Sequence, residues 1–487
     1  MTPLTTNPQG QILSGTVRIF LAESLILPTG LITTAILTRQ LGPAGYGWFT
    51  LAASAVAWIE WSIAAVFARA SFLYVAEAVD WRPVATTILQ LRVIISIVAA
   101  IGLVVLAGPI AGLLKAPALE GYLRLFAIDI PIVGASQAHS NVLVGIGAFR
   151  QRAWLSAGRW LTRCALVVLF VGMGFSIEGA IWACIGASVV ELVIARQFVQ
   201  PGLFSRSDFS ARRLLQQALP LTLFAVSTRL FDKMDLFFLK ALGASSAETG
   251  LYGGAQNLTI VPGLVALSLS PLLLSTISRL VREDGLAQAR EVSGQTLRWM
   301  TALIPFAAVA AAAAPEIVRL ILGDAFLGAA RPLSLLVFAA LSLVVVSAGT
   351  AILTAAGKAT WAVYLTAPMV PLAAAGHWLL IPRFGSSGAA SVTLATSTLA
   401  AIATVLAIHQ LWGVRPPLGT LLRSVAISMV AYAVTAAWPA ARLMVPLKLA
   451  IVCLLIGLGF GVLGEVRPDE IRWTRALLRR EISPARE

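Results

Sequence analysis

The sequence predicts an all-α protein that crosses a membrane many times. The chain of 487 residues is 58% hydrophobic and only 12% charged, whereas soluble proteins are about one-quarter charged. Apolar runs of about twenty residues, the length that crosses about 30 Å of hydrocarbon, recur along the whole chain. We therefore expect a polytopic membrane protein with no large soluble domain.

The apolar runs are separated by polar residues, glycine or proline and predict about fourteen transmembrane helices. The first run follows "MTPLTTNPQGQILSG", which has no basic flank and no cleavage site, so we expect a retained span and not a signal peptide. The expected spans are 12–37, 46–68, 86–114, 121–149, 153–173, 178–200, 213–241, 250–278, 293–322, 331–356, 360–381, 388–412, 419–437 and 442–464.

Basic residues are divided unevenly between the two sides of these spans. Most of the 36 Lys and Arg residues belong to one set of alternate loops and to the C-terminal tail. Cytoplasmic loops carry an excess of Lys and Arg, so both termini are expected in the cytoplasm. The same excess accounts for the net charge of +14 without a nucleic-acid partner. The tail "EVRPDEIRWTRALLRRE" is either a basic amphipathic helix on an anionic membrane surface or a disordered charged segment.

Turn sequences recur in the two halves of the chain in the same order. Leu41-Gly42 matches Leu242-Gly243, and Tyr46-Gly47 matches Tyr252-Gly253. "GAFRQRAWL" likewise parallels "GKATWAVYL", and "FSIEGA" parallels "FGSSGA". These matches predict two six-helix repeats that enter the membrane from the same side, an arrangement in which transporters bind substrate between the halves. The expected organisation is a short cytoplasmic N-terminus 1–11, a bundle 12–200, a cytoplasmic linker 201–212, a bundle 213–412, two extra helices within 413–464 and a basic cytoplasmic tail 465–487.

The motifs of common enzyme chemistry are missing from the sequence. There is no phosphate-binding loop and no zinc-protease motif, and Gly459, Gly461 and Gly464 satisfy a dinucleotide pattern only inside an apolar span. The three cysteines are widely spaced in apolar runs and indicate neither a disulfide framework nor a zinc site. We therefore expect no cofactor, no metal and no enzymatic activity, but a secondary carrier driven by an ion gradient or by the membrane potential.

Ionisable residues inside the expected spans are the best candidates for function, because such groups are expensive in lipid unless they face a cavity or a partner. Asp129, Ser136 and Ser140 fall on one face of a helix, flanked by Gln137 and His139. This polar stripe lines a hydrophilic cavity or makes hydrogen bonds between helices. His139 is a candidate for proton transfer, although a static hydrogen bond is the commoner role. The expected ion-coupling or charge-partner residues are Glu23, Glu60, Asp129, His139, Asp232 and Asp235.

The densest cluster of charges lies in "STRLFDKMDLFFLKALG" at 227–243. Helical spacing places Arg229, Asp232, Lys233 and Asp235 within one arc of about 160°. Their formal charges cancel, so the four residues either neutralise one another or lie along the path of a charged substrate.

The chain resembles the oligosaccharide and polysaccharide flippases of the multidrug/oligosaccharidyl-lipid/polysaccharide exporter superfamily. The resemblance rests on "LTRQLGPAGYGWFTLA", "RLFDKMDLFFLKALGASSAETGLYGGAQNL" and "PEIVRLILGDAFLGAARPLSLL". It implies a V-shaped core of two six-helix bundles plus two C-terminal helices, and an activity that moves isoprenoid-pyrophosphate-linked oligosaccharide from the cytoplasmic to the outer leaflet.

The family's cationic cavities match this sequence best at Arg18, Arg229 and Lys233. Together with Gln137 and Asn141 of the polar stripe, these are the candidate substrate-binding residues. The resemblance also implies that the two extra helices form a groove for the lipid tail. The arginine-rich first helix of lipid II flippases is absent from this sequence.

The resemblance also sets the expected location and partners of the chain. The expected location is a bacterial cytoplasmic membrane. The expected partners are membrane lipid, the lipid-linked oligosaccharide, and a polysaccharide polymerase or glycosyltransferases. A cation or drug antiporter of the same superfamily is the main alternative, and a membrane glycan polymerase or ligase is a further one.

Overall fold

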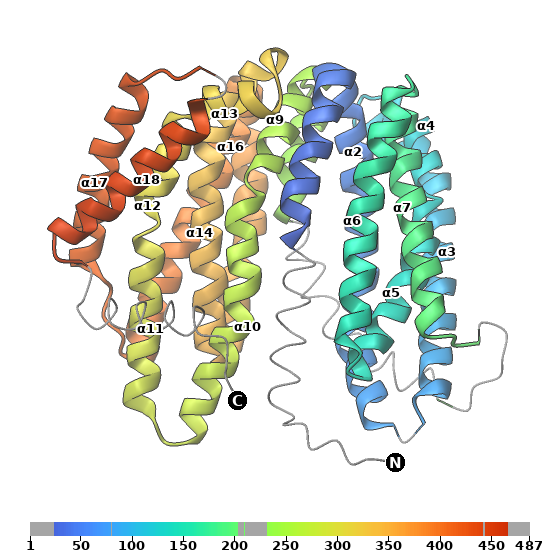
Figure 1. Cartoon of the computed structure of the whole chain (residues 1–487), viewed down its shortest axis with the longest axis horizontal. Coiled ribbons are helices and arrows are strands. Elements are labelled where there is room, and N and C mark those ends of the chain that lie inside the picture. Colours follow the sequence, from blue (N-terminus) through green and yellow to red (C-terminus); the bar gives the residue numbers. More distant parts are fainter. Residues whose placement is uncertain (1–23, 79, 203–208, 210–230, 442–443, 466–487) are drawn as a thin grey trace, which may run out of the picture.

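The computed structural model describes residues 24–78, 80–202, 209, 231–441 and 444–465. In these residues the protein is built from helices without a strand, which confirms the predicted fold class. Two groups of helices contact one another at one end, at the top of Figure 1, and diverge toward the other end. The appended pair α17 and α18 lies outside the second group.

The first group forms an N-terminal lobe. Its helices are α2 (Ile26–Glu77), α3 (Trp81–Leu113), α4 (Leu119–Phe126), α5 (Asp129–Gly145), α6 (Phe149–Gly172) and α7 (Ser176–Phe198). α2 contains two of the expected spans, which meet at a sharp turn at Gly42. Gly42 has a φ of +64°, a conformation that glycine adopts without steric cost, and Pro43 then starts the second helix.

The second group forms a C-terminal lobe that begins with the helical residues 231–241. It continues with α9 (Ser246–Leu258), α10 (Ile260–Arg282), α11 (Leu286–Thr301), α12 (Ile304–Ala312), α13 (Ala314–Ile321), the 3-10 helix η1 (Asp324–Ala329), α14 (Ala330–Ala355), α15 (Thr360–Thr366) and α16 (Met369–Trp412). The appended helices are α17 (Leu418–Ala437) and α18 (Val445–Val462). α16 again joins two expected spans, here across Gly385 with a φ of +54°.

Several expected spans are interrupted helices and not single rods. The expected span 121–149 is divided between α4 and α5, and 250–278 between α9 and α10. The expected span 293–322 is divided among α11, α12 and α13, with proline in the first turns of the last two. Because proline cannot donate an internal helical hydrogen bond, it is tolerated in the first turn of a helix, and α12 and α13 each begin at such a proline. Eight described helices are long and apolar enough to span a membrane, or nine if the bent pair 286–312 and 314–321 is one span. Two of them, 26–65 and 360–412, each combine parts of two expected spans.

The backbone carries the repeat that the sequence indicated. Three pairs of equivalent turn residues share a positive φ: Gly42 and Gly243, Gly147 and Gly357, and Ser176 and Gly385. The same turn therefore closes equivalent helix pairs in both halves. The expected linker 201–212 lies largely outside the described residues, so the division into domains stays a prediction.

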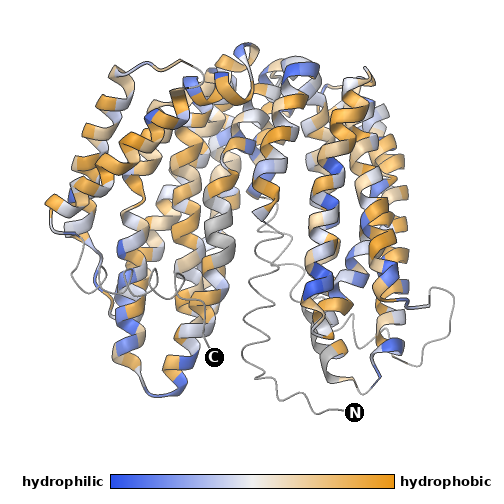
Figure 2. Ribbon diagram, viewed as in Figure 1, coloured by the Kyte–Doolittle hydropathy of each residue, from blue (hydrophilic) through white to orange (hydrophobic). Residues whose placement is uncertain are grey.

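Most of the ribbon in both lobes is hydrophobic, with hydrophilic segments along α6 and along α11 (Figure 2). Large apolar side chains such as Val105, Leu422 and Leu454 are exposed on α3, α17 and α18. Such surfaces suit a hydrocarbon solvent, in which the charged groups must find partners inside the protein.

Candidate functional site

Five charged residues from four helices meet in the interior of the N-terminal lobe. Glu60 comes from α2, Asp129 from α5, Arg159 and Arg163 from α6, and Glu191 from α7. Electrostatic interactions connect Glu60 with the other four, so the residues form one cluster. The cluster has three acidic and two basic members, and it therefore carries a formal charge of about −1 when all are ionised.

Only one ion pair within the cluster is close. Arg159 Nη1 lies 3.2 Å from Glu191 Oε2, and the Glu191 side chain is only 5% exposed. Asp129 is 3% exposed, and its Oδ1 has no hydrogen-bond partner. One Glu60 oxygen, Oε1, is also buried without a partner. The cluster thus offers two buried carboxylate oxygens that no donor among the described residues satisfies.

Arg159 and Arg163 were not among the candidate residues that the sequence offered. Both lie within α6, one helical turn apart, where they face acidic residues of three other helices. The four-residue spacing, which puts two side chains on one helix face, is the signal that could have identified them.

The polar stripe on α5 is buried inside the N-terminal lobe. Ser136, His139 and Ser140 are buried where α5 packs against α2, α3 and α7. His139 Nδ1 donates a hydrogen bond to the Ala135 carbonyl, 2.7 Å away, which is the static role considered for this residue. The Asn141 Nδ2 is buried without a partner.

Gln137 has a specific partner that the sequence did not reveal. Its Oε1 accepts a hydrogen bond from Arg92 of α3, a residue that was not a candidate from the sequence. Arg92 is only 1% exposed and lies over the Phe67 ring, with Nε and Nη1 unpaired. Gln137 therefore acts first as the acceptor for a buried arginine.

A second polar network surrounds Asp235 in the C-terminal lobe. Its carboxylate accepts hydrogen bonds from Tyr252 Oη at 2.5 Å, Gln256 Nε2 at 2.8 Å and Thr393 Oγ1 at 3.2 Å. These donors belong to α9 and α16, so one buried carboxylate joins three helical segments. Asp235 is a charge partner whose oxygens have protein donors.

The other members of the charged stretch have different surroundings. Lys233 is half-buried, and its Nζ donates to Gln256 Oε1 at 3.1 Å. Asp232 is exposed. The expected arc of charges thus divides between a buried network and the surface of the lobe. Arg18, Glu23 and Arg229 lie outside the described residues.

An apolar groove runs along the C-terminal lobe toward α17. Its volume is about 990 Å³, and its walls come from α11, α12, α14, α16 and the start of α17. Lining residues on α16 extend from Ser391 to Leu406, about 22 Å of helix. A smaller apolar pocket of about 260 Å³ lies between α17 and α18.

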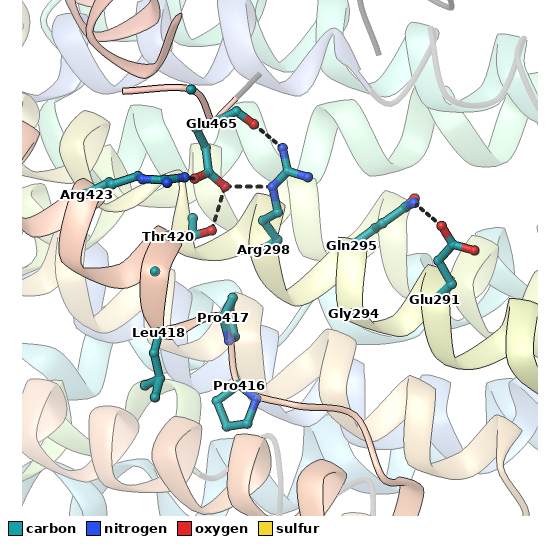
Figure 3. A pocket seen from close by; sticks show the side chains of 12 residues that line it. Glu291, Gly294, Gln295, Arg298, Pro416, Pro417, Leu418, Thr420, Arg423 and Glu465 are labelled. Carbon is teal, nitrogen blue, oxygen red and sulfur yellow. Dashed lines mark hydrogen bonds and ion pairs between the residues drawn. The ribbon is translucent and has the colours of Figure 1, made fainter. Parts of the chain in front are cut away.

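A polar pocket of about 570 Å³ adjoins this groove (Figure 3). In it, Glu465 receives Arg298 Nε at 2.7 Å, Arg423 Nη1 at 2.5 Å and the Thr420 hydroxyl at 2.5 Å. Burial opposes ionisation of Glu465, but the hydrogen bonds from Thr420, Arg423 and Arg298 outweigh it and lower the pKa of this carboxyl. The sequence indicated none of these four residues as a candidate, and so did not predict the pocket.

The fold is that of known membrane transporters. The structure of a lipid II flippase MurJ in an inward closed conformation matches 96% of this chain over 100% of its own length. The TM-score is 0.73 and the sequence identity is 12%. A multidrug resistance MATE family transporter of the MOP superfamily in an inward-facing conformation matches 82% of this chain and 98% of its own, with a TM-score of 0.64 and 15% identity. At these identities the likeness establishes the fold alone.

The family follows from the sequence itself. Residues 36–331 match the family described as polysaccharide biosynthesis protein, and the chain belongs to this family. It is also 25% identical over 247 residues to the succinoglycan biosynthesis transport protein ExoT of Rhizobium meliloti (strain 1021). That match spans 49% of this chain and 47% of the relative, about half the length of each.

Proposed function

We propose that this protein flips an isoprenoid-pyrophosphate-linked oligosaccharide, the repeat unit of a polysaccharide, from the cytoplasmic to the outer leaflet by alternating access. The observation that carries this proposal is the apolar groove, which accompanies membership of a polysaccharide biosynthesis family. A wall of about 22 Å along α16 suits one long hydrocarbon chain. A transporter of small soluble sugars would have no use for such a groove.

The charged headgroup and sugars would follow the path between the lobes while the lipid tail stays in the groove. On this proposal Arg18, Arg229 and Lys233 bind the pyrophosphate, because arginine and lysine are suited to phosphate oxygens. Lys233 supports this role in part: its Nζ donates to the neutral Gln256 amide, while Asp232 and Asp235 are its electrostatic neighbours. Gln137 and Asn141 are the proposed amide contacts to sugar.

The acidic residues are the proposed means of coupling. Glu60 and Asp129 offer unsatisfied carboxylate oxygens to a proton or cation, whereas Asp235 is held by three side-chain donors. Glu23, Asp232 and His139 complete the proposed set. The membrane potential is a further drive, because moving one charge through 100 mV is worth about 2.3 kcal/mol.

The proposed location is a bacterial cytoplasmic membrane with both termini in the cytoplasm. In this place the protein would receive its substrate from glycosyltransferases and deliver it to a polysaccharide polymerase. The substrate is complete before it arrives, so the chain itself needs no catalytic group.

A second candidate function is export of cationic drugs or metabolites by cation antiport. The acidic surplus of the N-terminal cluster, three carboxyl groups against two arginines, favours it, because carboxylates in excess of the arginines can bind a cation from outside. Antiport of soluble cations gives no role to the apolar groove or to the pair of arginines beside it.

Deletion of the gene tests the two functions together. The flippase predicts loss of a surface polysaccharide and accumulation of its lipid-linked repeat unit on the cytoplasmic leaflet, both restored by the wild-type gene. Restoration should fail with Lys233→Gln at normal membrane level. Unchanged surface glycan combined with greater sensitivity to cationic drugs would support antiport in place of flipping.

A further inference from the structure

The polar pocket and the apolar groove are two parts of one continuous surface. Pro416, Pro417 and Leu418 line both, at the junction between α16 and α17 (Figure 3). Beyond the two prolines, the 570 Å³ pocket is lined by charged and amide side chains, and the 990 Å³ groove is mainly apolar. A molecule that filled both would have a polar head at one end and a long apolar chain.

The polar pocket holds an anionic group of the protein itself. The Glu465 carboxylate lies between two guanidinium groups and a hydroxyl, and Arg298 also donates to the Glu465 backbone carbonyl. Two arginines and a hydroxyl are also suitable donors for a phosphate, whose oxygens accept paired hydrogen bonds from arginine. The donor set is therefore suited to a phosphate as well as to a carboxylate.

Glu465 is placed so that it can leave this position without unfolding a helix. It follows the end of α18 at Val462 and the glycine at 464, which has a φ of +66°. Within the helix cap its backbone N–H donates to the Phe460 carbonyl, a bond that does not involve the carboxylate. The side chain of Arg423 is 43% exposed, so this guanidinium is open to a ligand from outside the protein.

We propose that Arg298, Arg423 and Thr420 bind the phosphate of the lipid carrier whose isoprenoid chain lies in the groove. Glu465 occupies the same position when no carrier is bound. The inference rests on the proposed flippase function and adds a loading site for its substrate. The site lies at the helix ends that the sequence places in the cytoplasm, where the carrier enters.

Binding of a polyprenyl pyrophosphate without sugar to the purified full-length chain in nanodiscs tests the site. Arg423→Gln should weaken binding about tenfold, the loss expected of one charge-assisted hydrogen bond. Glu465→Gln removes the competing charge while its amide oxygen can still accept from the arginines, and it should tighten binding about tenfold. Arg415→Gln, an exposed arginine near the pocket, is the matched control and should leave binding unchanged.

The opposite changes in affinity that are expected for Arg423→Gln and Glu465→Gln distinguish a binding site from a structural ion pair. A purely structural role would move the affinities of Arg423→Gln and Glu465→Gln in the same direction, which would overturn the proposal. Equal binding to all variants would also overturn it, yet would leave the flippase function standing, since that function depends on the glycan phenotype. An uncharged polyprenol should bind every variant alike. Dependence on Arg423 seen with phosphatidylglycerol but not with polyprenyl pyrophosphate would assign the site to a membrane phospholipid and reject the carrier.

Discussion

Gly47 of α2 and Gly250 of α9 pack against each other where the two lobes meet. A Cβ atom on Gly250 would lie 1.9 Å from the Pro43 carbonyl oxygen, and one on Gly47 would lie 2.0 Å from the Ser246 carbonyl oxygen. Each glycine thus faces the residue four positions before the other, a reciprocal contact between equivalent parts of the two repeats. Neither helix has room for a methyl group, so this contact holds the lobes together at one end.

We expect Gly250→Ala to separate the lobes at this contact, because the obstacle is backbone that cannot rotate away. The reporter is a cysteine at Thr50, which is buried against Gly253, in a chain whose three native cysteines are replaced by serine. Labelling of this cysteine by an impermeant thiol reagent should become several-fold faster. Gly30→Ala, where a Cβ meets nothing within 4 Å, is the control. Equal labelling rates in both variants would show that the contact does not close the lobes.

The acidic residues of the N-terminal cluster should differ in what they contribute to stability. Glu191→Gln leaves Arg159 without its ion-pair partner, and breaking a buried pair costs about 3–5 kcal/mol. Asp129→Asn breaks no close ion pair, so the protein should stay folded. Thermal unfolding in detergent measures the difference. If Asp129→Asn lowers the melting temperature as much as Glu191→Gln, Asp129 is a structural residue and not a free coupling site.

In the C-terminal lobe, substitutions at Asp235 and at Lys233 should likewise differ in their effect on the amount of folded protein. Asp235→Ala leaves Tyr252, Gln256 and Thr393 without their acceptor, and folded protein in the membrane should fall strongly. Lys233→Gln loses one hydrogen bond, to the Gln256 amide, together with the attraction to Asp232 and Asp235, and it should reach the membrane normally while glycan export fails. Immunoblots of membrane fractions together with surface-glycan staining measure both effects. Equal loss of protein in the two variants would contradict a substrate role for Lys233.

The contact of Glu465 with α11 and α17 should weaken in acid. Hydrogen bonds hold the folded-state pKa of Glu465 below its ordinary value of 4.5, so the carboxylate stabilises the protein above that pH. The contribution is lost as the pH falls through the lowered folded-state pKa. The difference in melting temperature between wild type and Glu465→Gln should be constant from neutral pH to about pH 5 and shrink below it. A difference that disappears already near neutrality would contradict this account.

Two single cysteines determine the orientation of the protein. Ser176 is exposed at the turn between α6 and α7, and Ala287 is exposed near the start of α11. The distribution of basic residues predicts that Ser176→Cys reacts with an impermeant reagent in intact cells and that Ala287→Cys reacts only after permeabilisation. The reverse pattern would place both termini outside.

The sequence by itself determined the class of fold, because hydrocarbon imposes a simple rule on every span. An apolar run long enough to cross the bilayer must be a helix, since only a helix satisfies its own backbone groups in lipid. The repeat was also readable, because turns that need a positive φ select glycine, as at Gly42 and Gly243. Interruptions such as those before α12 and α13 were missed although prolines mark them, since a proline in an apolar run can also belong to one kinked helix.

Only the tertiary structure decided which charges meet. Arg159 and Glu191 are separated by 32 positions in sequence and Arg298 and Glu465 by 167, and no periodicity within one helix specifies such pairs. The same limit explains why the stripe on α5 was interpreted equally well as a cavity wall or as helix contacts: spacing gives the face, but the neighbouring helices decide what covers it. Burial then sets the consequence, because a charge without a partner is expensive in a dry interior and modest in water.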